Sequence, residues 1–264
     1  MIVAGIDMGA LTTKAVVLKD GEVIGQSIIT ASEEGEVQAR RTLEEAIKQS
    51  GITPNDIQYI VVTGEGRKSV SFANKEKTTP TAISKGANKL FPSARMVIDV
   101  GGESSTVIRM TEKGGVEDSM SNDKCASGTG VFLETMAKLM QISLEEFARL
   151  SLQAQKKAEI SNTCAIFAES EVVSHVHRDP PTPKNDVIAG IHASIASRIG
   201  GFVRRLGIKE DVVLSGGVAK NAGFARVMEE ELGVRILIPQ EPQLVAALGA
   251  ARIAQEEMAR KKTS

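Results

Sequence analysis

An internal repeat built on two Asp-x-Gly turns constrains the fold of this chain more than any other feature. The first turn starts at Asp7 after apolar residues 2–6, and the second starts at Asp99 after apolar residues 96–98. Hydroxyl residues, a second apolar segment, a polar glycine turn and a third segment follow each of them. This order predicts an antiparallel meander of three strands in each half. The aspartates lie 92 residues apart, too far for a solenoid unit, so the repeat favours two duplicated lobes.

Helix-like and strand-like segments alternate along the rest of the chain. Helical spacing covers 37–49, 82–90, 130–141, 143–154, 165–177, 184–206, 221–232 and the residues from 243 onward. Apolar segments typical of strands cover 57–64, 211–215 and 235–238. Such alternation indicates an α/β protein.

Charge and composition exclude several classes of partner. The 32 Lys and Arg residues nearly balance the 33 Asp and Glu residues, so no strong field favours nucleic acid or a membrane surface. With no Trp and one Tyr, the chain lacks material for base-stacking platforms. No apolar run approaches the roughly 20 residues that span a bilayer, and the N-terminus lacks the charged region of a signal peptide. We therefore expect a cytoplasmic protein.

Both Asp-x-Gly turns have the chemistry of a phosphate site. Glycine lets the backbone approach an anion closely, and successive N–H groups form a nest for phosphate oxygens. The carboxylates of Asp7 and Asp99 would repel phosphate, and Mg²⁺, bound directly or through water, would remove that conflict. A further glycine turn at 216–217 follows the strand 211–215 and could pack against a ribose and base. A lone Asp-x-Gly is usually a plain hairpin turn, but three glycine turns after buried strands favour nucleotide binding.

These motifs resemble those of the sugar kinase, heat-shock ATPase and actin superfamily. Residues 7–14 are similar to its first phosphate motif, 99–104 to the second, 215–219 to the adenosine motif, and 246–250 to the second connecting helix. The resemblance implies two ribonuclease-H-like, actin-like ATPase lobes with a nucleotide cleft between them. It implies a first lobe of residues 1–93 with the C-terminal helix 244–264, and a second lobe of residues 94–243.

The resemblance also implies a set of ATP or ADP ligands and of catalytic groups. The implied nucleotide-binding residues are Gly9, Ala10, Leu11, Thr12, Thr13, Lys14, Gly101, Gly102, Glu103, Ser104, Gly216, Gly217, Val218 and Gln243. The implied catalytic residues are Asp7, Asp99 and Glu103, with the two aspartates also holding Mg²⁺, directly or through water.

The only two cysteines, Cys125 and Cys164, each stand just ahead of a segment with helical spacing. The positive end of a helix dipole favours a thiolate, which suits chemistry or metal ligation. Two thiolates are half of what a four-cysteine iron–sulfur cluster needs. Simple burial is the usual alternative for cysteines in an intracellular protein.

Within the superfamily the chain most resembles the ATP-dependent activators of 2-hydroxyacyl-CoA dehydratases, a group that includes benzoyl-CoA reductase ATPase subunits. The most specific similarities lie in residues 122–130, 163–172 and 188–192. The resemblance implies a homodimer in which Cys125 and Cys164 of each chain hold one [4Fe–4S] cluster on the two-fold axis. It also implies ferredoxin or flavodoxin as electron donor, and a cluster-containing dehydratase or reductase as acceptor.

Glu103 departs from the family pattern, since activators of this kind usually have glutamine there. A carboxylate could activate the attacking water or bind the metal, and the departure makes a double-cubane-cluster protein a candidate acceptor beside a dehydratase. Two other functions stay open: a small-molecule, sugar-type kinase and a non-redox, actin-like or chaperone-like regulatory ATPase. His192, in an amphipathic helix, is interpreted as a hydrogen-bonded packing residue.

Overall fold

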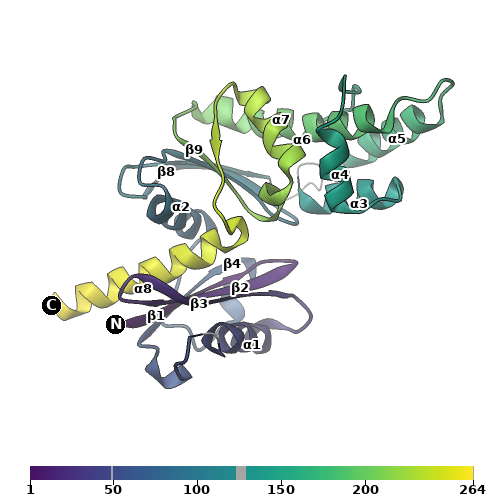
Figure 1. The fold of residues 1–264 in the computed structure, drawn as a ribbon. Helices are drawn as coiled ribbons and strands as arrows, with labels where there is room; N and C mark the ends of the chain where they lie inside the picture. The colour runs from purple at the N-terminus through teal and green to yellow at the C-terminus, as the bar shows by residue number, and fades with distance from the viewer. Residues whose placement is uncertain (49, 123–128, 264) are drawn as a thin grey trace. The chain divides into compact units, whose positions relative to one another are not determined.

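Two five-stranded sheets share one strand order in the computed structural model, which describes residues 1–48, 50–122 and 129–263 (Figure 1). The first sheet runs β3 (Glu22–Thr30), β2 (Thr12–Lys19), β1 (Ile2–Met8), β4 (Tyr59–Gly64), β5 (Lys75–Glu76). The second runs β8 (Val116–Asn122), β7 (Ser105–Met110), β6 (Met96–Val100), β9 (Val212–Ser215), β10 (Ile236–Leu237). Each strand of one sheet thus has its counterpart in the other.

Pairing directions follow the repeat as well. β1 pairs antiparallel with β2 and β2 with β3, while β6 pairs antiparallel with β7. The fourth strand of each order, β4 or β9, lies parallel to the third, β1 or β6. These mixed sheets with their helices confirm the expected α/β, two-lobed architecture.

Helices account for most of the remaining described chain. They are α1 (Gly35–Lys48), α2 (Thr79–Leu90), α3 (Gly130–Leu139), α4 (Leu144–Ser151), α5 (Ala165–His177), α6 (Lys184–Leu206), α7 (Ala222–Leu232) and α8 (Val245–Thr263). Four short 3₁₀ segments join them to strands: η1 (Pro54–Asp56), η2 (Glu65–Ser69), η3 (Gly217–Lys220) and η4 (Pro242–Leu244). Across the described residues, no helix combines the length and apolarity that a membrane span requires.

The chain divides into two units, each with its own core. The first comprises Met1–Arg95, Met110–Glu117 and Pro239–Ser264, and the second comprises Met96–Arg109 and Asp118–Ile238. In the first unit, Val3 of β1 packs in a cluster with residues of α2 and α8, whereas Ala4 and Ile6 belong to a cluster that includes α1. Alternate strand residues therefore cover both faces of that sheet.

Glycines allow unusually close backbone packing around α8. A Cβ built on Gly249 of α8 would lie 1.7 Å from the carbonyl oxygen of Ala82 in α2, and one on Gly86 would lie 2.0 Å from that of Val245. On the sheet side, a Cβ on Gly5 of β1 would lie 2.2 Å from the Ala247 carbonyl oxygen. Such separations are far below van der Waals contact, so α2, α8 and β1 approach one another only because these side chains are absent.

Candidate functional site

The first Asp-x-Gly turn joins β1 to β2 and places a carboxylate opposite a lysine. Asp7 and Lys14 are cross-strand partners, and Lys14 Nζ lies 3.1 Å from Asp7 Oδ2. Asp7 is buried, whereas Ala10 and Leu11 at the tip of the turn are exposed. Lys14, expected as a phosphate ligand, is therefore held at the base of the turn by the carboxylate. Thr12 and Thr13 begin β2 on the same turn.

The second turn joins β6 to β7 and repeats this geometry with a different partner. Ser215 at the end of β9 donates a hydrogen bond of 2.6 Å to Asp99 Oδ1. Thr63 takes the same place beside Asp7 in the first sheet, but its Oγ1 is buried and finds no hydrogen-bond partner among the described residues. Glu103 is exposed at the turn, between Gly102 and Ser104. The two units thus keep the carboxylate and differ in what surrounds it.

Helix α3 begins on the second turn. The backbone N–H of Gly130 donates to the carbonyl of Gly101 at 2.9 Å, and that of Val131 donates to Gly102 at 2.9 Å. A Cβ on Gly130 would lie 3.2 Å from the Gly101 carbonyl oxygen, so glycine suits this close approach. The predicted phosphate turn and the start of α3 are therefore one hydrogen-bonded structure.

The third glycine turn follows β9. Gly216 has φ 86°, and a Cβ there would lie 2.3 Å from the Val100 carbonyl oxygen, so only glycine fits. Gly217 and Val218 open η3, which leads into α7. Gln243 lies in η4 of the first unit. Each expected nucleotide-binding residue thus lies in or beside a strand-end turn or in η4, and the set remains a prediction.

Cys164 is the N-cap residue of α5. Its carbonyl accepts the N–H of Ala168 at 3.0 Å, and its side chain is partly exposed and outside any disulfide. Cys125 lies outside the described residues. Among those that are described, no group of three or more His, Cys, Asp or Glu side chains is placed to hold a metal ion.

The segment ahead of Cys164 is held by contacts that the sequence did not suggest. Arg198 of α6 donates from Nη1 to the carbonyls of Asn162, at 2.8 Å, and Thr163, at 3.1 Å. Glu171 of α5 accepts the N–H of Ser161 at 2.5 Å. These contacts span up to 36 residues, so no local motif could have revealed them. They fix the backbone from which the thiol projects.

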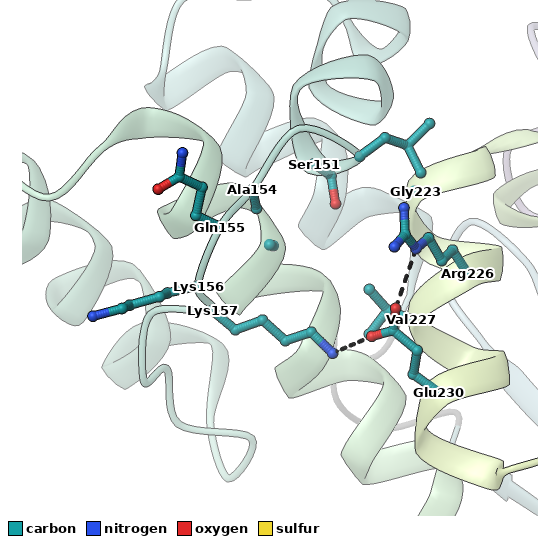
Figure 2. A pocket seen from close by; sticks show the side chains of 11 residues that line it. Ser151, Ala154, Gln155, Lys156, Lys157, Gly223, Arg226, Val227 and Glu230 are labelled. Atoms are coloured by element: carbon teal, nitrogen blue, oxygen red, sulfur yellow. Dashed lines mark hydrogen bonds and ion pairs between the residues drawn. The ribbon is translucent and has the colours of Figure 1, made fainter.

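A polar pocket of about 310 Å³ lies in the second unit, between the segment after α4 and helix α7 (Figure 2). Glu230 of α7 accepts from Lys157 at 2.6 Å and from Arg226 at 3.2 Å on one of its walls. These bonds, led by the one from Lys157, keep the pKa of Glu230 below its ordinary value. Ser151 and Gly223 also line this pocket, next to the start of α7.

His192 of α6 lies close by and is fully buried, which confirms its interpretation as a hydrogen-bonded packing residue. Its ring nitrogens contact Ser151 at 2.7 Å and Asn221 at 3.1 Å. Burial lowers its pKa to about 3, because the charged imidazolium would lose its hydration there.

This depressed pKa predicts a pH-dependent stability. Since His192 has a lower pKa in the folded protein than the ordinary 6.5, the unfolded chain binds its proton first as the pH falls. Its contribution is therefore complete above pH 6.5 and is lost below it, at up to about 1.4 kcal/mol of unfolding free energy per pH unit. Urea unfolding should show a smaller decrease in unfolding free energy from pH 7.5 to pH 5.5 for His192→Gln than for the parent chain. Equal losses would contradict the prediction.

Comparisons with known proteins identify the family of the chain. The chain matches the BadF/BadG/BcrA/BcrD ATPase family over residues 4–254. It is 42% identical to the activator of lactoyl-CoA dehydratase from Anaerotignum propionicum, covering 99% of this chain and 100% of that protein. The solved activator of 2-hydroxyisocaproyl-CoA dehydratase from Clostridium difficile, with bound ADPNP, matches with a TM-score of 0.92 and 38% identity, over 100% of this chain and 97% of that one.

A second solved relative extends the comparison. It is component A of (R)-2-hydroxyglutaryl-CoA dehydratase from Acidaminococcus fermentans, with a TM-score of 0.93 and 38% identity over 98% of this chain and 99% of that one. The backbone match to both solved relatives therefore extends over nearly the whole chain. The chain belongs to the BadF/BadG/BcrA/BcrD ATPase family.

Proposed function

We propose that this protein is an ATP-dependent, low-potential electron donor that activates a partner iron–sulfur enzyme. The proposed active form is a homodimer with one bridging [4Fe–4S] cluster, which would couple ATP hydrolysis to the transfer of single electrons. The observation that carries the proposal is the hydrogen-bonded junction between the Gly101–Gly102 turn and the start of α3. It joins a phosphate-type turn to the helix that directly follows the chain segment containing Cys125.

Nucleotide and Mg²⁺ are assigned to the turns described above. In this proposal backbone N–H groups and hydroxyls of residues 9–14, 101–104 and 216–218, with Gln243, bind ATP or ADP. Mg²⁺ would neutralise phosphate charge beside Asp7 and Asp99. The buried hydroxyl of Thr63 beside Asp7, which has no hydrogen-bond partner in the described part of the chain, supports this assignment, because it leaves a donor for an oxygen ligand at that carboxylate. Glu103, exposed at the second turn, is assigned to orient the attacking water.

Cys164 fits a cluster ligand in its chemistry and its support. A thiolate at the N-cap of a 13-residue helix is stabilised by the helix dipole. Arg198 and Glu171 hold the preceding segment, so the thiol has a defined position from which to bind. When bound, the cluster supplies a one-electron redox centre. Two cysteines from each chain of a symmetric dimer would provide its four ligands.

The names of the relatives support the proposed electron acceptor. An activator of lactoyl-CoA dehydratase and a component of 2-hydroxyglutaryl-CoA dehydratase are among them. We assign a cluster-containing dehydratase or reductase as acceptor, with a double-cubane-cluster protein as a further candidate because of Glu103. Reduced ferredoxin or flavodoxin would supply the electron, and ATP would leave as ADP and phosphate.

Anaerobic purification tests both the proposed cluster and the proposed ATP hydrolysis. The expected protein is a brown dimer with about four irons that hydrolyses ATP in the presence of Mg²⁺. Asp99→Asn should keep the iron and lower ATP hydrolysis by roughly 100-fold, because the amide cannot serve as an anionic metal ligand. Ser119→Ala, on an exposed part of β8, is the matched control and should change neither.

Each alternative has its own outcome. A colourless, iron-free protein that phosphorylates a sugar hydroxyl would identify a kinase of the same fold. An iron-free protein that hydrolyses ATP and transfers no phosphate or electron would identify a regulatory ATPase. Either result overturns the proposed electron donor.

A further inference from the structure

His192 occupies a buried site between two phenyl rings. It lies midway along α6, with none of its surface exposed. The rings of Phe147 and Phe224 meet it edge-on, with centroids at 5.3 and 6.1 Å. Those phenyl groups come from α4 and α7, so the imidazole sits where three helices of the second unit converge. A polar ring in such a place needs both nitrogens satisfied.

The neighbours of the ring define its tautomer. Asn221 Oδ1 accepts the backbone N–H of Phe224 at 2.9 Å, so its amide nitrogen is the atom that faces His192 Nε2 at 3.1 Å. An amide nitrogen only donates, and Nε2 must therefore accept. The single proton of the neutral ring then lies on Nδ1, which donates to Ser151 Oγ at 2.7 Å. The neutral imidazole therefore accepts a hydrogen bond from Asn221 and donates one to Ser151.

Asn221 stands at the exit of the third glycine turn. Its own N–H donates to the carbonyl of Val218 at 2.9 Å, which closes η3. Its side chain caps α7, and its amide nitrogen reaches back to His192. The other end of the turn is fixed by the close approach of Gly216 to Val100. The turn is therefore held between the strands at its entrance and the imidazole at its exit.

Ser151 anchors the opposite side of the imidazole. It is the last residue of α4 and lines the polar pocket of Figure 2, together with Gly223 of α7. A Cβ on Gly223 would lie 2.8 Å from the Ala148 carbonyl oxygen and 2.9 Å from Ser151 Cβ, so α4 and α7 touch at this point. Movement of α4 relative to α7 would therefore change both hydrogen bonds of the ring.

We infer that His192 is a positioning residue for nucleotide binding: its Nδ1–H tautomer fixes Asn221, and through Asn221 the Gly216–Lys220 turn. This inference rests on the proposed function, because it concerns the turn assigned there to ATP. The imidazole does not touch the nucleotide itself. A leucine would fill the site, but it would leave the Asn221 amide without its acceptor and the end of the turn without its anchor.

Two amide substitutions at His192 distinguish the hydrogen bond at Nε2 from the hydrogen bond at Nδ1. Glutamine places an amide oxygen near the position of Nε2 and can still accept from Asn221. Asparagine places its amide nitrogen near the position of Nδ1 and can still donate to Ser151, but it cannot reach Asn221. Each variant keeps one hydrogen bond and loses the other, so a purely structural role predicts similar effects for both.

The affinity for a fluorescent ATP analogue should therefore differ between the two variants. We expect His192→Gln to bind within about twofold of the parent chain, and His192→Asn to bind about tenfold more weakly, the equivalent of one net hydrogen bond. Asn221→Ser keeps a capping hydroxyl for α7 but loses the contact with His192, and it should weaken binding to the same extent. Combining it with His192→Asn should add little further loss.

Ser194→Ala provides the matched control. It removes another buried hydrogen bond of α6, from Ser194 Oγ to the Ile191 carbonyl at 2.9 Å, with no link to the turn. It should leave ATP-analogue affinity unchanged. Nitrogen NMR of labelled histidine should place the His192 proton on Nδ1. An Nε2–H tautomer, or equal affinities for the Gln and Asn variants, would overturn the inference.

Amide exchange in the turn decides the inference even if the nucleotide assignment fails. In the full chain without nucleotide, His192→Asn should raise hydrogen exchange at the amides of residues 217–221 by about tenfold, and His192→Gln should not. Unchanged exchange in both variants would overturn the positioning role. If the two variants show this exchange pattern but the parent chain binds no ATP, the proposed function is overturned, whereas the role of His192 in fixing the Gly216–Lys220 turn stands.

Discussion

Cys164→Ser is expected to bind ATP normally and to hold almost no iron. Serine is a good N-cap residue, so α5 should keep its start and the fold its stability. Its hydroxyl is not a thiolate, however, and in a symmetric dimer one substitution removes two of the four cluster ligands. Iron should fall from about four per dimer to less than a tenth of that, and electron transfer to the acceptor should be lost. Iron analysis and visible absorbance of anaerobic protein measure the change.

Ser170→Ala is the matched control for this variant. Ser170 lies on the same helix and donates only to the carbonyl of Ile166 at 3.0 Å, so its loss should leave the cluster intact. ATP-analogue affinity should be equal in all three proteins. Full iron content in Cys164→Ser would contradict the assignment of the thiol. Loss of both iron and ATP binding would point to a folding defect, which circular dichroism would detect.

Gly249→Ala is expected to destabilise the first unit severely. The added Cβ would lie 1.7 Å from the Ala82 carbonyl oxygen and 2.7 Å from the Gly86 backbone nitrogen. Since neither atom belongs to a flexible side chain, α2 and α8 must separate, which disturbs the apolar cluster between them and β1. Overpacking of this kind costs about 3 kcal/mol or more. In a chain of this size, that cost lowers the unfolding midpoint by roughly 6 to 12 °C.

Gly201→Ala tests whether helix propensity could mask this effect. Gly201 lies in α6, and nothing stands within 4 Å of a Cβ built there. Alanine should therefore stabilise the helix by roughly 0.5–1 kcal/mol. Thermal unfolding followed by circular dichroism should move in opposite directions for the two variants. A midpoint for Gly249→Ala no lower than that of the parent chain would show that α2 and α8 are not in close contact.

The repeat and most helices could be predicted because their signals are local. Alternating apolar residues and turn glycines specify the meanders, and the helices at 165–177 and 184–206 begin and end where their spacing indicates. Local chemistry also explains two differences. The helix expected from residue 82 starts at Thr79, since Pro80 suits a first turn. The helix expected to reach residue 141 ends at Leu139, and Gln141 adopts a positive φ of 55°.

The candidate site could be predicted only as residue types. The turns at Asp7 and Asp99 carry their chemistry in a few adjacent residues, which a sequence reveals. The contacts that support the third glycine turn and the Cys164 segment join residues far apart in sequence: Ser151 lies 41 residues from His192, and Arg198 lies 35 from Thr163. The Lys14–Asp7 pair lies between these two cases: the sequence does not show it directly, but it follows from the register of β1 and β2 once the hairpin is assumed. The long-range pairs depend on tertiary packing, and no local sequence motif indicates them.

The seating of α8 against β1 has a consequence for how this chain is made. Gly5 packs on Ala247, which leaves the ribosome 242 residues later. At 5–20 residues per second, the first sheet waits roughly 12 to 48 s for the helix that covers one of its faces. The residues of the second unit are all synthesised before α8 appears. The unit whose synthesis begins first is thus completed last, and during that interval one apolar face of its sheet lacks the helix that covers it.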